Sequence, residues 1–170
     1  MADCGNPFEG FDASRVSSPC FVVDEVAVER NLKILSQVQE ESGAKVLAAL
    51  KAFSMWNLAP LVSKYLSGTC ASGLHEARLG REEYGGEVHV FSAAYSESDL
   101  REILDIADHV VFNSFAQWQR FQPLLKAAKE LRPQLQFGLR INPQHSEGEV
   151  AIYDPCAPCS RLGIPLGQFE

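Results

Sequence analysis

The stretch VLAALKAF, residues 46–53, decides which fold this sequence predicts. Its first five residues are apolar without a polar interruption, which is typical of a strand buried on both faces of a parallel sheet. Lys51 then ends the run. The carboxyl ends of parallel strands are where α/β barrels and open α/β sheets hold their active sites, although most lysines in such a position are simply solvated. Lys51 is therefore a candidate site residue that the rest of the sequence has to support.

Strand and helix patterns alternate on both sides of this stretch. Five further strands are predicted, at residues 20–24, 69–71, 88–92, 109–113 and 136–142. Helices are predicted between them, one beginning at the capping residue Asp24 and another at Ser96. Residues 1–17 are predicted to be an irregular leader, and the tail from Pro143 is loop-like. Six strands with five intervening helices indicate a parallel sheet with right-handed crossovers.

Two architectures fit this alternation. An open doubly wound sheet can be completed within 170 residues. It normally has a Gly-rich phosphate turn after its first strand, however, and VVDEVAVER, residues 22–30, has none. A (β/α)8 barrel needs about 250 residues, so 170 residues would hold roughly six of its eight strands. We expect an incomplete barrel to have two unpaired sheet edges and to associate through them.

The composition is that of an ordinary globular domain, with 46% hydrophobic and 22% charged residues. The formal net charge of −7 argues against nucleic acid or an anionic membrane as a partner, since both need clustered lysine and arginine. No apolar run approaches about 20 residues, and the N-terminus is acidic, so neither a membrane span nor a signal peptide is expected. A cytoplasmic location is the prediction.

Five cysteines, an odd number, point to reduced thiols. Cys156 and Cys159 form a CxxC in the Pro-rich DPCAPC, but a zinc site would need a second ligand pair, and His145 is an unconvincing third ligand. We therefore expect plain loop residues and no metal site.

Four segments resemble the N-terminal barrel of the fold-type III pyridoxal phosphate (PLP) enzymes, the group of alanine racemase, ornithine decarboxylase and diaminopimelate decarboxylase. They are LAALKAF, CASGLHEARLG, LRINP and YDPCAPCSRLGIP, starting at residues 47, 70, 139 and 153. The resemblance runs from about residue 19 onward. It is strongest to the carboxynorspermidine and carboxyspermidine decarboxylases, through INPQHSEGEV and DPCAPCSRLGIP. It implies an α/β fold, the (β/α)8 TIM barrel of the alanine racemase/ornithine decarboxylase type, truncated here to about six strands over residues 18–170.

Roles for single residues follow from this resemblance. Lys51 matches the lysine that binds PLP covalently, and a lysine suits this because a desolvated ammonium loses its proton readily and becomes a nucleophile. Cys70 and Ser72 match a strand-end segment beside the cofactor. An acidic residue follows shortly after in the family, and either His75 or Glu76 takes its place. Both could instead face solvent from a first helical turn.

Two arginines complete the implied cofactor-binding set. Arg140 matches an arginine at the end of the sixth strand, where a guanidinium can hold a carboxylate or phenolate oxygen. Its alternative role is a surface ion pair. Arg161, with Ser160, occupies the family's SKFG-like segment at the rim of the site. The family's C-terminal β domain and a Gly-rich phosphate loop are not in these 170 residues.

The resemblance implies PLP-dependent decarboxylation of a carboxylated polyamine to norspermidine or spermidine, by a protein that is a homodimer at full length. The cofactor would serve as the electron sink for the carbanion. We expect little or no activity from the 170 residues alone. Two alternatives stay open: a sister enzyme acting on ornithine or diaminopimelate or racemising an amino acid, and a PLP-binding protein without catalytic activity.

Overall fold

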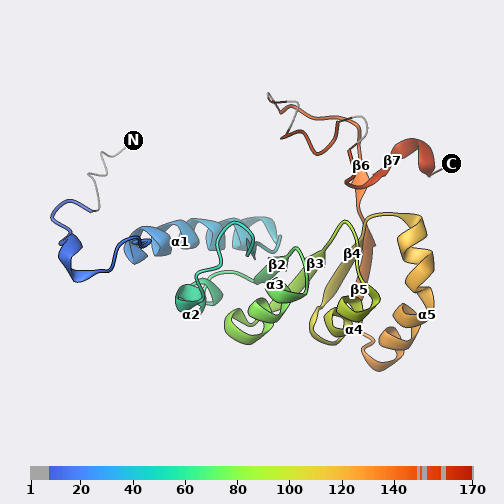
Figure 1. The fold of residues 1–170 in the computed structure, drawn as a ribbon, viewed down its shortest axis with the longest axis horizontal. Helices are drawn as coiled ribbons and strands as arrows, with labels where there is room; N and C mark the ends of the chain where they lie inside the picture. The colour runs from blue at the N-terminus through green and yellow to red at the C-terminus, as the bar shows by residue number, and fades with distance from the viewer. Residues whose placement is uncertain (1–7, 149, 151–152, 158–159, 170) are drawn as a thin grey trace.

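A computed structural model of the chain describes residues 8–148, 150, 153–157 and 160–169. Its centre is a parallel sheet with the strand order β1-β2-β3-β4-β5 (Figure 1). The strands are β1 Leu47–Ala49, β2 Gly68–Ala71, β3 Glu87–Phe91, β4 His109–Phe112 and β5 Gln136–Leu139. A doubly wound sheet reverses its strand order at a switch point. These five strands follow the chain order without reversal, as in a barrel.

Helices connect the strands. They are α1 Glu25–Ser42, α2 Ala59–Ser63, α3 Leu74–Leu79, α4 Glu97–Ile106 and α5 Phe115–Leu131, with a π-helical turn η3 at Gly80–Tyr84 and 3-10 turns at Ala13–Arg15, Trp56–Leu58 and Leu166–Gln168. The predicted caps are confirmed: Asp24 Oδ1 accepts from the backbone N of Val26 at 2.9 Å, and Ser96 Oγ accepts from that of Asp99 at 3.1 Å. No helix in the described part of the chain is long and apolar enough to cross a membrane.

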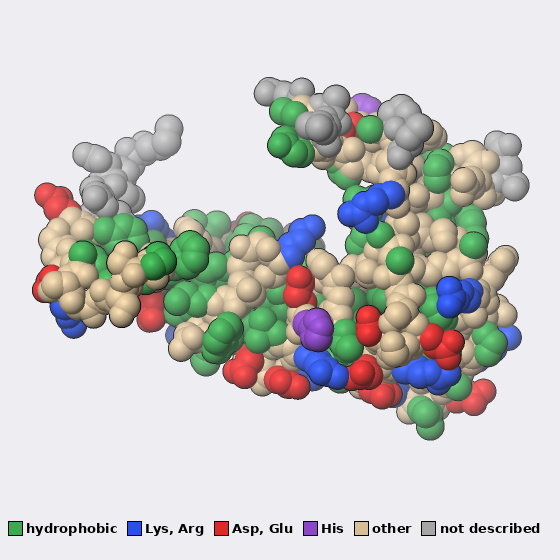
Figure 2. All heavy atoms as spheres, viewed as in Figure 1, with side chains coloured by type: hydrophobic (Ala, Val, Ile, Leu, Met, Phe, Trp, Pro, Cys, Tyr) green, Lys and Arg blue, Asp and Glu red, His purple; other side chains and the backbone are tan. Residues whose placement is uncertain are grey.

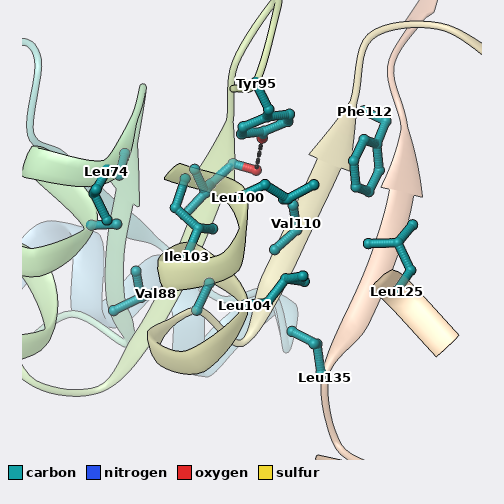
Figure 3. Packing of buried hydrophobic residues seen from close by; sticks show 14 of the residues in the cluster. Leu74, Val88, Tyr95, Leu100, Ile103, Leu104, Val110, Phe112, Leu125 and Leu135 are labelled. Carbon is teal, nitrogen blue, oxygen red and sulfur yellow. Dashed lines mark hydrogen bonds between the residues drawn. The ribbon is translucent and has the colours of Figure 1, made fainter. Parts of the chain in front are cut away.

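The main core lies between the sheet and helices α3, α4 and α5 (Figure 3). Val88 and Val90 of β3, with Val110 and Phe112 of β4, are fully buried against these helices. Because strand side chains alternate between faces, the opposite face carries the residues between them, which are only half-buried. Burial therefore fixes the strands from the helix side and leaves a second face that is only half-buried, with polar and apolar side chains.

Tyr95 anchors the turn that follows β3. Its side chain is buried and its hydroxyl accepts from the backbone N of Ser92 at 3.0 Å and donates to the carbonyl of Val111 at 3.0 Å. Burial raises the pKa of Tyr95 well above its usual range, so the hydroxyl keeps its proton. The loop after β3 is thereby held against the end of β4.

Three sequence predictions need correction. Residues 20–24 form no strand, and Phe21 is 96% exposed, because this apolar run has no neighbouring strand with which to pair. The strand predicted at residues 136–142 breaks at Arg140, and its second part, β6 Ile141–Asn142, pairs with β7 Ile164–Pro165. Because residues 20–24 form no strand, the main sheet has five described strands rather than six. Residues 46–50 were expected to be buried on both faces, but only Leu50 is buried, because β1 has a single neighbour in the sheet.

Candidate active site at the carboxyl ends of the strands

Two adjoining hollows lie at the carboxyl ends of the strands and share Lys51, Ser72 and Phe91. The smaller, about 170 Å³, also contains Cys70 and His89. The larger, about 410 Å³, also contains Arg140 and Arg161. Figure 2 shows the molecule hollowed above this end of the sheet, with basic side chains on both sides of the hollow. The structure thus brings together Lys51, Ser72 and both predicted arginines.

The last backbone hydrogen bond between the first two strands positions Lys51. Leu50, which is 1% exposed, donates its backbone N to the carbonyl of Cys70 at 3.1 Å. The chain then turns, with the N of Ala52 bonded to the carbonyl of Ala49 at 3.0 Å. A buried residue and a tight turn on either side therefore direct the exposed Lys51 side chain into both hollows.

The predicted site residues at and after the end of β2, Cys70 to Glu76, lie in different surroundings. The backbone N of Ser72 donates to Glu76 Oε2 at 2.7 Å, which holds the Glu76 carboxylate at the end of β2. His75 is exposed, and neither His75 nor Glu76 lines either hollow. Burial raises the pKa of the Cys70 thiol, and the Lys51 charge only partly opposes this, so Cys70 is a neutral thiol at neutral pH. The assignment of the acidic position to His75 or Glu76 stays a prediction.

Arg140 sits where β5 passes into β6. Its guanidinium carbon lies 4.6 Å from the centre of the Phe91 ring, a cation–π contact that points it over the larger hollow. Its backbone N donates to the carbonyl of Phe112 at 2.9 Å, and its own carbonyl accepts from the N of Ile164 at 2.8 Å. Strands on both sides therefore fix the Arg140 backbone.

Asn113 is a site residue that the sequence analysis did not identify. Its Oδ1 accepts from the backbone N of Gly163 at 2.7 Å, and its Nδ2 donates to the carbonyl of Arg161 at 2.8 Å. Gly163 has φ +83°, and a Cβ there would lie 2.8 Å from the backbone N of Asn142. The sequence RLG therefore needs its glycine for close packing on β6, and Asn113 docks the segment that carries Arg161. The available signal was a polar residue ending a predicted strand.

The electrostatics of the larger hollow favour an anion. Lys51, Arg140 and Arg161 line it, and no acidic residue is among its described lining residues. Arginine binds carboxylate and phosphate groups through paired N–H donors, and an amine reacts with carbonyl compounds. The arrangement suits a ligand with both an anionic group and a reactive carbonyl.

The CxxC is only partly described. Cys156 is half-buried in its loop, and its backbone N donates to Asp154 Oδ1 at 2.8 Å. Cys159 lies outside the described residues.

No protein-family profile matches the sequence, but curated proteins do. The chain is 40% identical over 164 residues to the carboxyaminopropylagmatine decarboxylase of Synechocystis sp., covering 96% of this chain and 41% of that protein. It is 40% identical over 148 residues to the carboxynorspermidine/carboxyspermidine decarboxylase of Herminiimonas arsenicoxydans, covering 87% and 39%. The enzyme of that name from Campylobacter jejuni is 38% identical over 156 residues, covering 92% and 39%.

Solved structures agree with this result. The crystal structure of Campylobacter jejuni carboxynorspermidine decarboxylase complexed with norspermidine superposes with a TM-score of 0.75 at 35% identity, covering 91% of this chain and 38% of that one. D-threonine aldolase from Filomicrobium marinum gives 0.59 at 17% identity, over 68% and 33%, and supports the fold alone. With the unreversed strand order, these likenesses show part of an alanine racemase-type barrel.

Proposed function

We propose, from the relationship of this chain to the carboxynorspermidine/carboxyspermidine decarboxylases over about two-fifths of their length, that it forms the lysine-bearing part of a PLP-dependent decarboxylase acting on carboxylated polyamines. The observation that carries the proposal is the meeting of Lys51, Arg140 and Arg161 around one hollow at the carboxyl ends of the strands. The reaction would be a carboxy-lyase step of norspermidine or spermidine biosynthesis.

The residues fit PLP, an aldehyde with an anionic phosphate. Lys51 Nζ would hold the aldehyde carbon, while Arg140 and Arg161 would balance anionic oxygens of the cofactor or of the substrate carboxylate. When bound, the cofactor supplies an electron sink for the electrons left by departing carbon dioxide.

The neighbouring side chains would shape the site around this cofactor. Cys70 and Ser72 lie beside Lys51 in the smaller hollow. Glu76, which accepts from the backbone N of Ser72, or His75 is the proposed acidic-position residue, although neither lines a hollow. The Cys70 thiol, neutral because burial raises its pKa, would serve as an S–H donor or as packing, and not as a nucleophile. The stacking of Arg140 on Phe91 would keep its guanidinium oriented before the ligand arrives.

A second substrate of the same chemical class is favoured by a specific observation. The relative named carboxyaminopropylagmatine decarboxylase matches 96% of this chain at 40% identity. Carboxyaminopropylagmatine therefore joins carboxynorspermidine and carboxyspermidine as a candidate. The net charge of −7 is compatible with each of these cationic chains.

The remaining features are proposed on the resemblance and the composition. We place residues 18–170 in one barrel domain and leave residues 1–17 outside it. We propose that the complete protein is a cytoplasmic homodimer without a nucleic-acid or membrane partner, in keeping with the acidic composition of these 170 residues.

The test uses the complete gene product with added PLP. Carbon dioxide release should be greatest with one of the three carboxylated polyamines and small with ornithine or diaminopimelate. Borohydride reduction followed by peptide mapping should label Lys51. A Lys51→Arg variant should lose both activity and label, whereas Lys64→Arg, at an exposed lysine outside both hollows, should retain them. A label on another lysine, or none, would refute the role of Lys51.

A further inference from the structure

Three potential metal ligands meet on the sheet face that is turned away from the helical core. Glu87 and His89 are two residues apart on β3 and therefore point to the same side. His109 of β4 is the register partner of His89. The imidazole rings of His89 and His109 stack with their centroids 3.9 Å apart and their planes 20° apart. One ligand atom from each of the three residues lies within 4.8 Å of the other two.

These side chains supply the donor set that zinc prefers, two imidazoles and one carboxylate. His89 Nε2 already lies 3.0 Å from Glu87 Oε2, so two of the three donors are in contact. We propose that Glu87, His89 and His109 bind a divalent cation of the zinc class. The site shares His89 with the smaller hollow but does not use Lys51, and the proposal does not depend on the proposed function.

The geometry needs only side-chain rotation. Zinc–nitrogen and zinc–oxygen bonds of about 2.0–2.2 Å in a tetrahedron place the ligand atoms roughly 3.3 Å from one another. The donors are separated by at most 4.8 Å, and their backbones are held by the β3–β4 pairing. Torsion about the histidine side-chain bonds can therefore bring them together without moving a strand. Three protein ligands leave a fourth position for water.

Lys45 pairs with one of the three proposed ligands when no metal is bound. The Lys45 ammonium is bonded to Glu87 Oε1, while Oε2 faces His89. The carboxylate can therefore give Oε2 to a metal while Oε1 keeps its outer partner, as carboxylate ligands commonly do. The lysine charge nevertheless repels a second cation, so Lys45 should weaken binding.

The position in the fold indicates what the cation would do. Glu87 and His109 are the first residues of β3 and β4, at the opposite end of the strands from Lys51. His89 also lines the smaller hollow. In barrels of this type the amino ends of the strands serve stability and the carboxyl ends serve catalysis. A cation here would join β3 to β4 and fix the inner end of the hollow.

The test is calorimetric titration of the metal-free protein with Zn²⁺, on the 170-residue chain and on the complete gene product. One ion per chain should bind, and the melting temperature should rise with Zn²⁺ concentration. His89→Ala and His109→Ala should each weaken binding at least about tenfold. His145→Ala, at an exposed histidine outside both hollows, should bind as the unchanged protein does.

The cysteines require a separate control, because Cys156 and Cys159 could also bind zinc. A Cys156→Ser/Cys159→Ser double variant should bind Zn²⁺ unchanged, and the Co²⁺ complex should lack the intense near-ultraviolet band of a thiolate ligand. Absence of stoichiometric binding, or its loss in the cysteine variant with retention in the histidine variants, would overturn the proposal.

Two milder variants keep the test usable if an alanine variant does not fold. Glu87→Gln should weaken binding, and Lys45→Gln should strengthen it several-fold by removing the competing charge. Unchanged affinity in Glu87→Gln, or weaker binding in Lys45→Gln, would refute the assignment of Glu87 as a ligand.

Discussion

Replacing Asn113 by alanine should release the segment that carries Arg161. Asn113 makes two hydrogen bonds to this segment, 2.7 Å to the backbone N of Gly163 and 2.8 Å from its own Nδ2 to the carbonyl of Arg161. Each is worth roughly 1 kcal/mol net, so their loss should weaken docking by about 2 kcal/mol. That free energy corresponds to about a thirtyfold change in the docking equilibrium.

The remaining attachment decides how the loss will be seen. The β6–β7 pairing persists in the variant, through the Ile164 N and the carbonyl of Arg140 at 2.8 Å. The segment should therefore open locally, and the fold should not be lost. Amide hydrogen exchange read at residues 160–163 should accelerate by about the same factor of thirty, with little change at β3 and β4.

An isosteric variant separates the two bonds. Asn113→Asp keeps the acceptor for the N of Gly163 but loses the donor to the carbonyl of Arg161, so it should fall between the alanine variant and the unchanged protein. If Arg161 contributes to the anion site, affinity for PLP should fall in the same order. Equal exchange in all three proteins would refute the docking role of Asn113.

Three further results are expected. Tyr95→Phe should lower the free energy of unfolding by roughly 2 to 4 kcal/mol in urea denaturation, because the backbone N of Ser92 and the carbonyl of Val111 lose a buried partner; a loss below about 0.5 kcal/mol would contradict this. Gly163→Ala should lower the melting temperature, since φ +83° and a Cβ 2.8 Å from a backbone atom are both unfavourable, and Gly167→Ala, with nothing within 4 Å, should not. Because its pKa is raised, Cys70 should react slowly with iodoacetamide at pH 7.5 and faster as the pH rises past 9; rapid alkylation at pH 7.5, followed by mass spectrometry, would show that a thiolate is present.

The strands in the middle of the sheet could be predicted because local pattern and tertiary environment agree there. The predictions at residues 88–92 and 109–113 are confirmed within one residue, since β3 and β4 each have neighbours on both sides and bury alternate side chains in the core. Residues 20–24 have the same β-branched character but no partner strand, and a sequence pattern cannot show whether a partner exists. The break at Arg140 was not predicted for a related reason. The strand before it pairs with β4 and the strand after it pairs with β7, and a local pattern does not show this change of partner.

The site divides in the same way. Lys51, Ser72, Arg140 and Arg161 were identified from segments whose residue types are shared with a known family, and the structure brings them to one end of the sheet. Asn113 and the cluster of Glu87, His89 and His109 were not, because their contacts depend on strand register and on a loop about 50 residues away. Spacing along the chain does not report register.

The two faces of the sheet explain how a polar site can coexist with a rigid scaffold. On the helix side, Val88, Val110 and Phe112 are completely buried, so sliding one strand against another would expose apolar surface and is opposed along the whole core. On the opposite face the alternate positions are only half-buried, so Glu87, His89 and His109 can stand there at little cost beside the apolar Phe91 and Val111. Lys51 shows this division between a buried backbone support and an exposed side chain most directly. Its neighbour Leu50 is buried in the core that includes Leu32 and Val62, so the core holds the lysine backbone in place while its amine remains exposed over the hollow.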